Sequence, residues 1–255
     1  MLLAASLPSV DQSRADEDKP FGLAKREIWE NSRLIGTPEP PPPFRAVPAY
    51  TNQVWRSPMF IAAETQSSRL FALLHHGGGK PTQLVAFEDR PETKEREVLL
   101  DLPGRNVYSF CFDPNYNENG HLYLFSNLNL EAFDGQKANR ISRVTLPRGS
   151  SEIDLASEHS IIEWRSGGHD GGGIAFGLDG MLYISTGDGT SDSDIWVSGQ
   201  TLNDLLGGVL RIDISETSED EPYRIPADNP FINLPDARGE LYAYGLRNPW
   251  RLAVD

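Results

Sequence analysis

The sequence predicts an all-β fold of the propeller type, in which four-stranded antiparallel sheets repeat around a common axis. Short apolar runs with a period of two recur along the chain between Gly, Asp and Asn residues, and no helical apolar pattern is sustained. The 23 glycines and 19 prolines indicate a protein rich in turns. A strand-turn-strand motif also repeats along the chain, and the spacing of its copies predicts how many strands each sheet contains.

This motif has two complete copies, one copy that only begins and one degenerate copy. They are "FCFDPNYNENGHLYLFSN" (110–127), "IAFGLDGMLYISTGDG" (174–189), "RLAVD" (251–255) and "MFIAAETQSSRLFALLHHG" (59–77). Phe112 and Phe176 are 64 positions apart, and Phe176 and Val254 are 78 apart. Units of this length hold about four strands, the content of one propeller blade. We therefore expect residues 55–255 to form roughly the first half of a propeller that is truncated at its C-terminus.

The first 54 residues differ from the rest. Residues 1–18 contain a short apolar stretch, then Ala15 and an acidic start, which favours the remnant of an export signal without its basic beginning. The protein is then expected to be periplasmic or secreted. Residues 19–54 include "TPEPPPPFRAVP", a stiff Pro-rich arm that cannot enter the middle of a sheet.

Composition limits the classes of partner. Asp and Glu number 37 against 23 Lys and Arg, giving a formal charge of −14, so nucleic acid would be repelled and a small neutral substrate is favoured. No apolar run reaches the roughly 18 residues of a membrane-spanning helix. The single cysteine, Cys111, excludes an intrachain disulfide and a cysteine-pair zinc or haem motif within this sequence.

Residues 167–175, "GGHDGGGIA", set His169 among five glycines. Glycines in that number indicate unusual backbone angles or a very close approach to the main chain. His169 is therefore either a turn residue that faces water or part of a site.

Four segments in order carry a resemblance to a known family. They are "GGHDGGGIAFGLDGMLYISTGDG", "LLGGVLRID", "IPADNPF" and "LYAYGLRNPWRLAVD". The chain resembles the soluble glucose/sorbosone dehydrogenase family, six-bladed propellers that use pyrroloquinoline quinone (PQQ), over residues 55–255 and most closely from residue 160. The resemblance implies a quinoprotein that oxidises a sugar or related alcohol and passes electrons to an acceptor such as a cytochrome. It also implies a calcium ion, held by backbone carbonyls beyond Asp255, and hence a chain that is inactive alone.

The resemblance assigns roles to four residues. His169 matches the general base that takes the substrate's hydroxyl proton, and Asp188 matches the carboxylate that supports it. Arg247 and Asn248 match an Arg-Asn pair that contacts the quinone, and Arg247 also faces the developing charge. An imidazole, whose ordinary pKa is about 6.5, suits proton abstraction near neutral pH. We expect His169, Asp188 and Arg247 to converge at one mouth of the channel, with 174–180 as the innermost strand and the Arg247 side chain reaching inward.

Other interpretations stay open. His169 can be a turn residue, Asp188 can serve only the tight turn "TGDG", and Arg247 can form a structural ion pair. The cluster "LLHHGGGKP" (73–81) is typical of a hairpin turn. Glutamines that hold the quinone in several family members are replaced here by "GRN" (104–106) and "GTSDSDIW". The alternative function is therefore a non-catalytic propeller that binds a carbohydrate or protein partner.

Overall fold

The computed structural model describes residues 45–75, 81–218 and 220–254. The chain divides into two units, residues 1–47 and 48–255, and the strands of the described residues all belong to the second. The predicted signal remnant, most of the predicted Pro-rich arm and the tip of the predicted 73–81 hairpin lie outside the described residues. Tyr50, at the described end of the arm, and Trp55, the first residue after it, both pack on Phe87, each with a ring-centroid distance of 5.1 Å.

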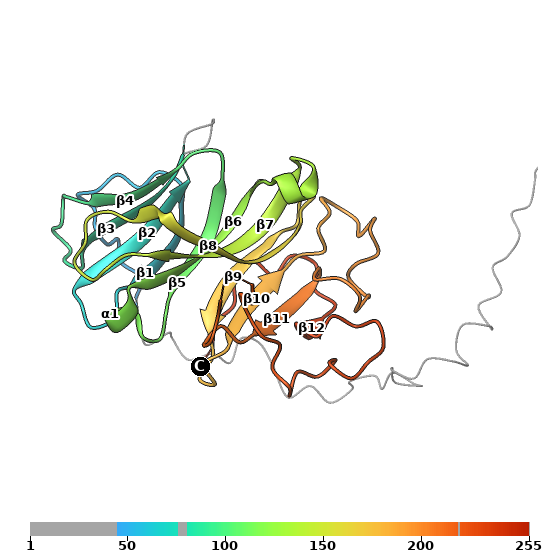
Figure 1. The fold of residues 1–255 in the computed structure, drawn as a ribbon. Helices are drawn as coiled ribbons and strands as arrows, with labels where there is room; N and C mark the ends of the chain where they lie inside the picture. The colour runs from blue at the N-terminus through green and yellow to red at the C-terminus, as the bar shows by residue number, and fades with distance from the viewer. Residues whose placement is uncertain (1–44, 76–80, 219, 255) are drawn as a thin grey trace, which may run out of the picture. The chain divides into compact units, whose positions relative to one another are not determined.

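Three four-stranded antiparallel sheets follow one another along the chain (Figure 1). The first contains β1 (Pro58–Ala63), β2 (Arg69–His75), β3 (Thr82–Glu88) and β4 (Glu97–Leu102). The second contains β5 (Asn106–Phe112), β6 (His121–Asn129), β7 (Lys137–Thr145) and β8 (Asp154–Arg165). The third contains β9 (Gly171–Phe176), β10 (Leu182–Thr186), β11 (Gly208–Ile212) and β12 (Leu241–Tyr244).

Helix is almost absent from the described part of the chain, where it consists of α1 (Tyr116–Asn119) and the 3-10 turn η2 (Glu131–Phe133). Each sheet is built from consecutive strands in chain order, which is the arrangement of a propeller blade. The prediction of an all-β propeller made of four-stranded blades is confirmed.

The first strands of the three sheets lie side by side. β5 contacts β1 on one side and β9 on the other. Between β5 and β9, the Ser109 hydroxyl donates a 2.6 Å hydrogen bond to the carbonyl oxygen of Gly172. Residues just before β5 and just before β9 are therefore brought to the same end of the fold.

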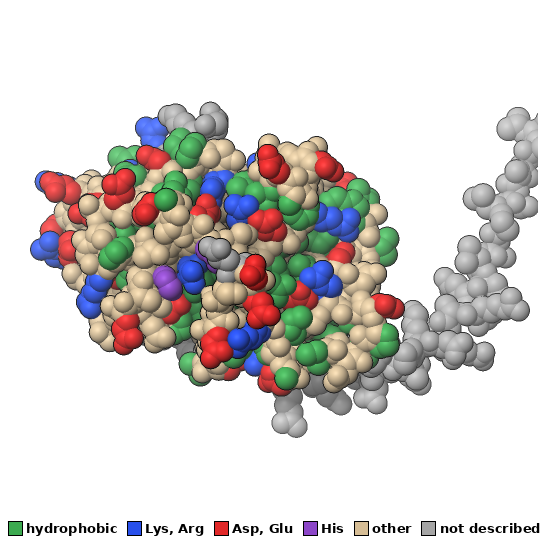
Figure 2. All heavy atoms as spheres, in the orientation of Figure 1, with side chains coloured by type: hydrophobic (Ala, Val, Ile, Leu, Met, Phe, Trp, Pro, Cys, Tyr) green, Lys and Arg blue, Asp and Glu red, His purple; other side chains and the backbone are tan. Residues whose placement is uncertain are grey.

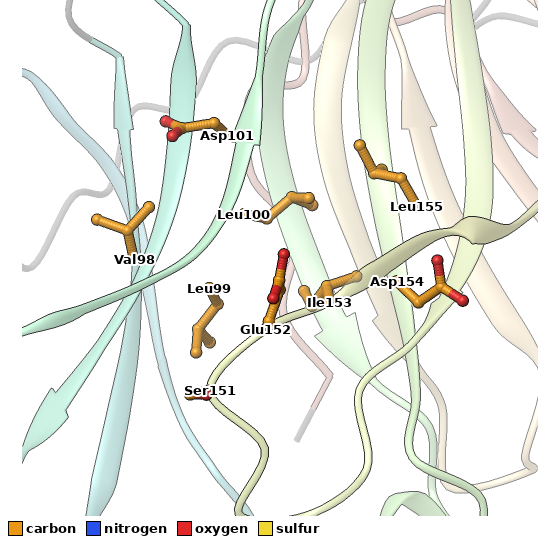
Figure 3. A pocket seen from close by; sticks show the side chains of 9 residues that line it. All are labelled: Val98, Leu99, Leu100, Asp101, Ser151, Glu152, Ile153, Asp154 and Leu155. Carbon is orange, nitrogen blue, oxygen red and sulfur yellow. The ribbon is translucent and has the colours of Figure 1, made fainter.

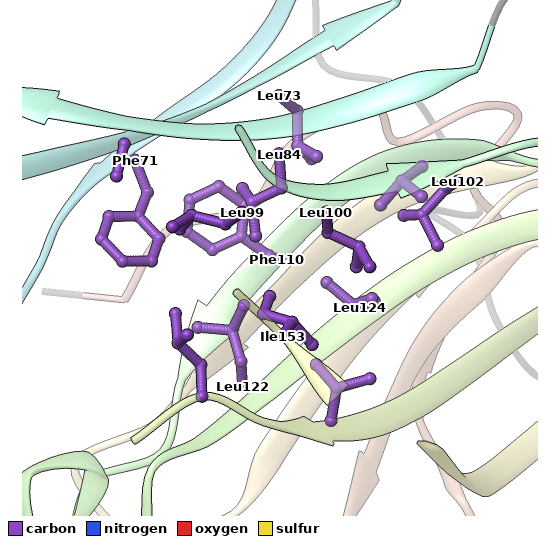
Figure 4. Close-up of a cluster of buried hydrophobic side chains, with 14 of the residues drawn as sticks. Phe71, Leu73, Leu84, Leu99, Leu100, Leu102, Phe110, Leu122, Leu124 and Ile153 are labelled. Atoms are coloured by element: carbon purple, nitrogen blue, oxygen red, sulfur yellow. The ribbon is translucent and has the colours of Figure 1, made fainter. Parts of the chain in front are cut away.

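Apolar side chains fill the spaces between neighbouring sheets. Figure 4 shows the cluster between the first and second sheets, where Phe71, Leu84, Phe110 and Leu122 are fully buried. A second cluster joins the second and third sheets, and each sheet uses alternate residues of its strands for it. The backbone ladders pair strands only within each sheet, so neighbouring sheets are held together by side-chain packing and by side-chain hydrogen bonds such as the one from Ser109 to Gly172.

The sequence repeat has a structural cause. In the second sheet, the Asp113 carboxylate accepts a hydrogen bond from the Asn115 N–H at 2.8 Å and another from the Tyr123 hydroxyl at 3.0 Å. In the third sheet, Asp179 accepts from the Met181 N–H at 3.1 Å and from the Tyr183 hydroxyl at 3.0 Å. The aspartate therefore shapes the turn after the first strand and fixes the tyrosine of the second strand in both sheets.

One ion pair ties the start of β5 to the outer strand β8. The Arg105 guanidinium contacts Glu158 twice, at 2.7 Å and 3.1 Å, and Ser142 donates to the same carboxylate at 2.7 Å. Burial alone would raise the pKa of Glu158, but the hydrogen bonds from Arg105 and Ser142 hold it below the ordinary value. Glu158 should therefore stabilise the fold only while it is ionised.

Glu158→Gln is expected to lower the free energy of unfolding by about 1–3 kcal/mol at pH 7, because a half-buried charged partner is lost. A folded-state pKa below the unfolded value of about 4.3 gives stability that is full above the unfolded value. That stability is lost as the pH falls through the folded value. Denaturant unfolding at pH 7, 5 and 3 should show the difference from wild type shrinking below about pH 4. A difference that stays constant with pH would contradict this, and Glu152→Gln, an exposed site without an ion pair, is the control.

Candidate active site

His169 and Asp188 are brought together by one hairpin. His169 lies two residues before β9, Asp188 lies two residues after β10, and the strands pair antiparallel with Gly171 opposite Thr186. The His169 Nδ1 atom lies 2.9 Å from Asp188 Oδ1. Both residues are buried, with 8% and 3% of their surface exposed. The hairpin thus creates a buried imidazole-carboxylate pair.

Glycines allow the two sides of this hairpin end to approach. A Cβ atom on Gly187 would lie 2.3 Å from the carbonyl oxygen of His169. Gly171 has φ of +79°, and a Cβ atom there would lie 2.2 Å from the carbonyl oxygen of Ser185. Neither contact is possible for a residue with a side chain, so the glycines of 167–175 serve a close main-chain approach.

Asp188 has two roles at once. Its Oδ1 atom accepts hydrogen bonds from the N–H of Thr190 at 2.9 Å and from the Thr190 hydroxyl at 3.1 Å, in addition to the contact with His169. An ionised carboxylate only accepts hydrogen bonds, so the neutral imidazole carries its proton on Nδ1 and keeps a lone pair on Nε2. Nε2 has no hydrogen-bond partner among the described residues, and 11% of the side-chain surface is exposed. The pair is arranged for proton acceptance at Nε2.

Arg247 reaches this region through its backbone, and Asn248 reaches it through its side chain. The Arg247 carbonyl accepts from the Asp188 N–H at 2.8 Å, and Asn248 Oδ1 accepts from the Gly171 N–H at 3.1 Å. The Arg247 side chain was expected to reach inward, but it is exposed and donates to the carbonyl oxygen of Asp192 at 3.2 Å. The guanidinium therefore binds the loop after β10 and makes no hydrogen bond with the side chains of His169 or Asp188.

The segment after Asn248 crosses the first strands of the sheets. The Trp250 ring lies 5.1 Å from that of Tyr108 in β5, and the Arg251 guanidinium lies 5.4 Å from the Phe60 ring in β1. Arg251 also donates a 2.5 Å hydrogen bond to the carbonyl oxygen of Met59, and burial lowers its pKa. The motif "RLAVD" therefore begins where the three sheets meet.

The sequence interpretation missed Asp170. This carboxylate has 6% of its surface exposed and accepts hydrogen bonds from Ser166 at 2.5 Å, Tyr108 at 2.8 Å and Asn139 at 3.0 Å. It forms no ion pair with any cation that the structure describes. Burial, followed by the charge of Asp170, raises the pKa of Tyr108, so the phenol stays a donor. The signal in the sequence was an aspartate inside the glycine run, but its donors come from separate strands.

A cavity of about 750 Å³ lies elsewhere. It is bounded by β4 and the start of β8, with Asp101, Glu152 and Asp154 among its lining residues (Figure 3). None of the predicted site residues lines it. Within the described ranges, no three His, Cys, Asp or Glu side chains are grouped to hold a metal ion. The predicted calcium, which involves backbone carbonyls beyond this sequence, stays a prediction.

Two general features of the chain accompany the site. Acidic and basic side chains are interspersed over the face shown in Figure 2 and do not form one basic patch there. A search of the described residues finds no helix with the length and apolar character needed to cross a membrane.

The sequence is similar to known proteins over part of its length. Hedgehog-interacting protein of Homo sapiens is 36% identical over 157 residues, which is 59% of this chain and 22% of that protein. Aldose sugar dehydrogenase YliI of Escherichia coli is 36% identical over 90 residues, 35% of this chain and 21% of that protein. This chain therefore spans about a fifth of the length of these curated relatives.

Solved structures support the fold. The soluble aldose sugar dehydrogenase of Escherichia coli in its apo-form matches with a TM-score of 0.56 and 20% identity, over 76% of this chain and 52% of that one. The family model described as Glucose / Sorbosone dehydrogenase matches residues 107–255, which contain the second and third sheets and the His169-Asp188 pair. The chain therefore belongs to the glucose/sorbosone dehydrogenase family and has the fold of its oxidoreductase-like propellers.

Proposed function

We propose that this chain carries the general base of a quinoprotein that oxidises a sugar or a related alcohol. His169 would accept the hydroxyl proton of the substrate while the hydrogen on the same carbon leaves as hydride, so that the alcohol becomes a carbonyl. The observation that supports this most is the buried pair, in which Asp188 holds Nδ1 and leaves the Nε2 lone pair available. PQQ, when bound, supplies the two-electron acceptor for such a hydride.

Asp188 would stabilise the imidazolium that forms when His169 takes the proton. A carboxylate in this position also fixes the tautomer, which keeps Nε2 ready for the next turnover. A base in such a geometry contributes roughly 10²- to 10⁴-fold to the rate. The surrounding glycines leave main chain without side chains beside the imidazole, where a substrate hydroxyl can approach.

The described residues fit the chemistry of the cofactor. PQQ is a flat tricarboxylate, so its site should offer cations and a surface free of side chains. The Arg251 guanidinium lies beside Gly172, and the Arg247 main chain contacts Asp188. Neither arginine forms an ion pair with a carboxylate in the part of the chain described. Arg247 would hold a carboxylate through its planar fork, and the Asn248 amide nitrogen would add a donor. No described residue is assigned to calcium.

The proposal includes a compartment and a partner. A quinoprotein of this kind would work in the periplasm or outside the cell and pass its electrons to a carrier such as a cytochrome. The apolar start and Ala15 of the N-terminal segment support export.

A second candidate function is a propeller without catalysis that binds a protein partner. The match to Hedgehog-interacting protein covers 157 residues, against 90 for the aldose sugar dehydrogenase at the same 36% identity. The replaced glutamines at 104–106 and after "TGDG" also favour it. The two candidates predict opposite results when the cofactor is added.

Adding PQQ and calcium to the full-length apoprotein is expected to change the absorption of the quinone and to permit dye reduction by an aldose. Arg247→Lys should weaken quinone binding about tenfold or more and lower turnover, because an ammonium cannot reproduce the bidentate fork. Arg224→Lys, at an exposed ion pair with Glu216, is the matched control. Quinone binding that is unchanged in Arg247→Lys would remove Arg247 from the site. An unchanged spectrum and no dye reduction with wild type would favour the protein-binding candidate.

A further inference from the structure

A second polar cavity lies at the opposite end of the inner strands from His169. His169 precedes the first residue of β9, whereas Phe176, the last residue of β9, lines this cavity. Its volume is about 430 Å³, and its other walls come from the loop after β5, α1, β6, β7, the β9-β10 turn and the loop after β11. Because it lies between the second and third sheets, residues from both blades face the same space.

The charges around this cavity leave one cation uncommitted. The Asp113 carboxylate accepts from a main-chain N–H, an asparagine amide and a tyrosine hydroxyl. Glu216 pairs with Arg224 at 2.6 Å. Arg143 has no carboxylate within ion-pair distance among the described residues, and its guanidinium makes only a long 3.4 Å contact with the Thr217 hydroxyl. A half-buried guanidinium without an anion is a ready partner for a ligand carboxylate.

Neutral polar groups surround this arginine. His121, which lies on the neighbouring strand β6, is half-buried, and its side chain makes no hydrogen bond with a described residue. Burial and the nearby charge of Arg143 lower its pKa, so the imidazole is neutral at pH 7 and can donate and accept. The Asn115 side chain is also without a described partner, and Phe176 presents a half-buried ring. Such a mixture suits the hydroxyls and the apolar face of a sugar ring.

We propose that this cavity binds a sugar acid, a small hydroxylated molecule with one carboxylate. The carboxylate would pair with Arg143, the hydroxyls would bind His121 and Asn115, and the ring would lie on Phe176. A single carboxylate fits better than a phosphate dianion, because Asp113 and Glu216 also line the cavity and would repel a second negative charge. This site is independent of the His169 pair and of the proposed oxidation.

Isothermal titration of the protein with sodium D-glucuronate, D-glucose and inorganic phosphate, without PQQ, tests this directly. Glucuronate is expected to bind about tenfold to a hundredfold more tightly than glucose, which is the range that hydrogen bonds to a charged group provide. Phosphate should bind more weakly than glucuronate. Equal affinity for glucuronate and glucose, or tighter binding of phosphate, would overturn the proposal.

Variants locate the binding. Arg143→Gln should reduce glucuronate affinity to that of glucose, and Asn115→Ala should weaken both sugars, whereas Arg148→Gln at an exposed site should change neither. His169→Ala should bind glucuronate as wild type does, which separates this cavity from the candidate active site. Unchanged glucuronate affinity in Arg143→Gln, with an unchanged thermal unfolding midpoint, would overturn the assignment, as would loss of binding in His169→Ala.

Discussion

His169→Ala is expected to lower the turnover of an aldose or alcohol by about two to four orders of magnitude in the quinone-loaded full-length protein. The imidazole acts when the proton leaves the hydroxyl, so the loss should fall on kcat more than on substrate or quinone binding. Dye reduction under saturating substrate measures turnover, and the absorption of the quinone reports its binding. Alanine leaves the hairpin glycines in place, so the main-chain contacts with Thr190 and Gly189 can persist.

Two further variants make this test specific. His75→Ala, at the end of β2 in the first sheet, is the matched control and should keep full turnover. Asp188→Asn should also lower turnover, because a neutral amide cannot stabilise the imidazolium. Sugar oxidation by His169→Ala at the wild-type rate would remove the base from the mechanism and leave the fold and the protein-binding candidate standing.

The blades could be predicted because their signals are local. In the second and third sheets, the turn aspartates Asp113 and Asp179 bind tyrosines ten and four residues further along, so the repeat is visible in a short stretch of sequence. The contact between His169 and Asp188 is local in the same sense, since one hairpin separates them. Both features could be predicted from the sequence because the residues that form them are close together in the chain.

Features that depend on contacts between distant parts of the chain could not be predicted from the sequence. The donors to Asp170 include Tyr108 and Asn139, which are 62 and 31 residues away in sequence. The direction of the Arg247 side chain depends on the carbonyl of Asp192, which lies 55 residues earlier. The cavity at Arg143 is formed by two blades together. The periodicity or motif of a single strand does not indicate which residues of other strands will lie beside it.

The close approach of the backbone at the candidate active site has a consequence for stability. Gly171→Ala is expected to lower the free energy of unfolding by about 3–5 kcal/mol, among the largest effects of a single substitution. One part is the left-handed backbone at φ of +79°, which costs a residue with a side chain about 1–2 kcal/mol. The larger part is the contact at 2.2 Å between the new Cβ atom and the main-chain oxygen of Ser185, which cannot move without breaking the β9-β10 hairpin.

Gly180→Ala separates these two costs. Gly180 has nearly the same backbone angle, with φ of +78°, but a Cβ atom there would meet nothing within 4 Å. This variant should therefore lose only about 1–2 kcal/mol, the cost of the left-handed conformation. Denaturant unfolding followed by tryptophan fluorescence measures both variants against wild type. Equal losses of unfolding free energy in the two variants would mean that the hairpin can widen at Gly171. The glycine run would then have no role in holding His169 against Asp188. If Gly171→Ala instead loses about 2 kcal/mol or more beyond the loss in Gly180→Ala, as expected for a buried backbone clash, the close approach requires glycine.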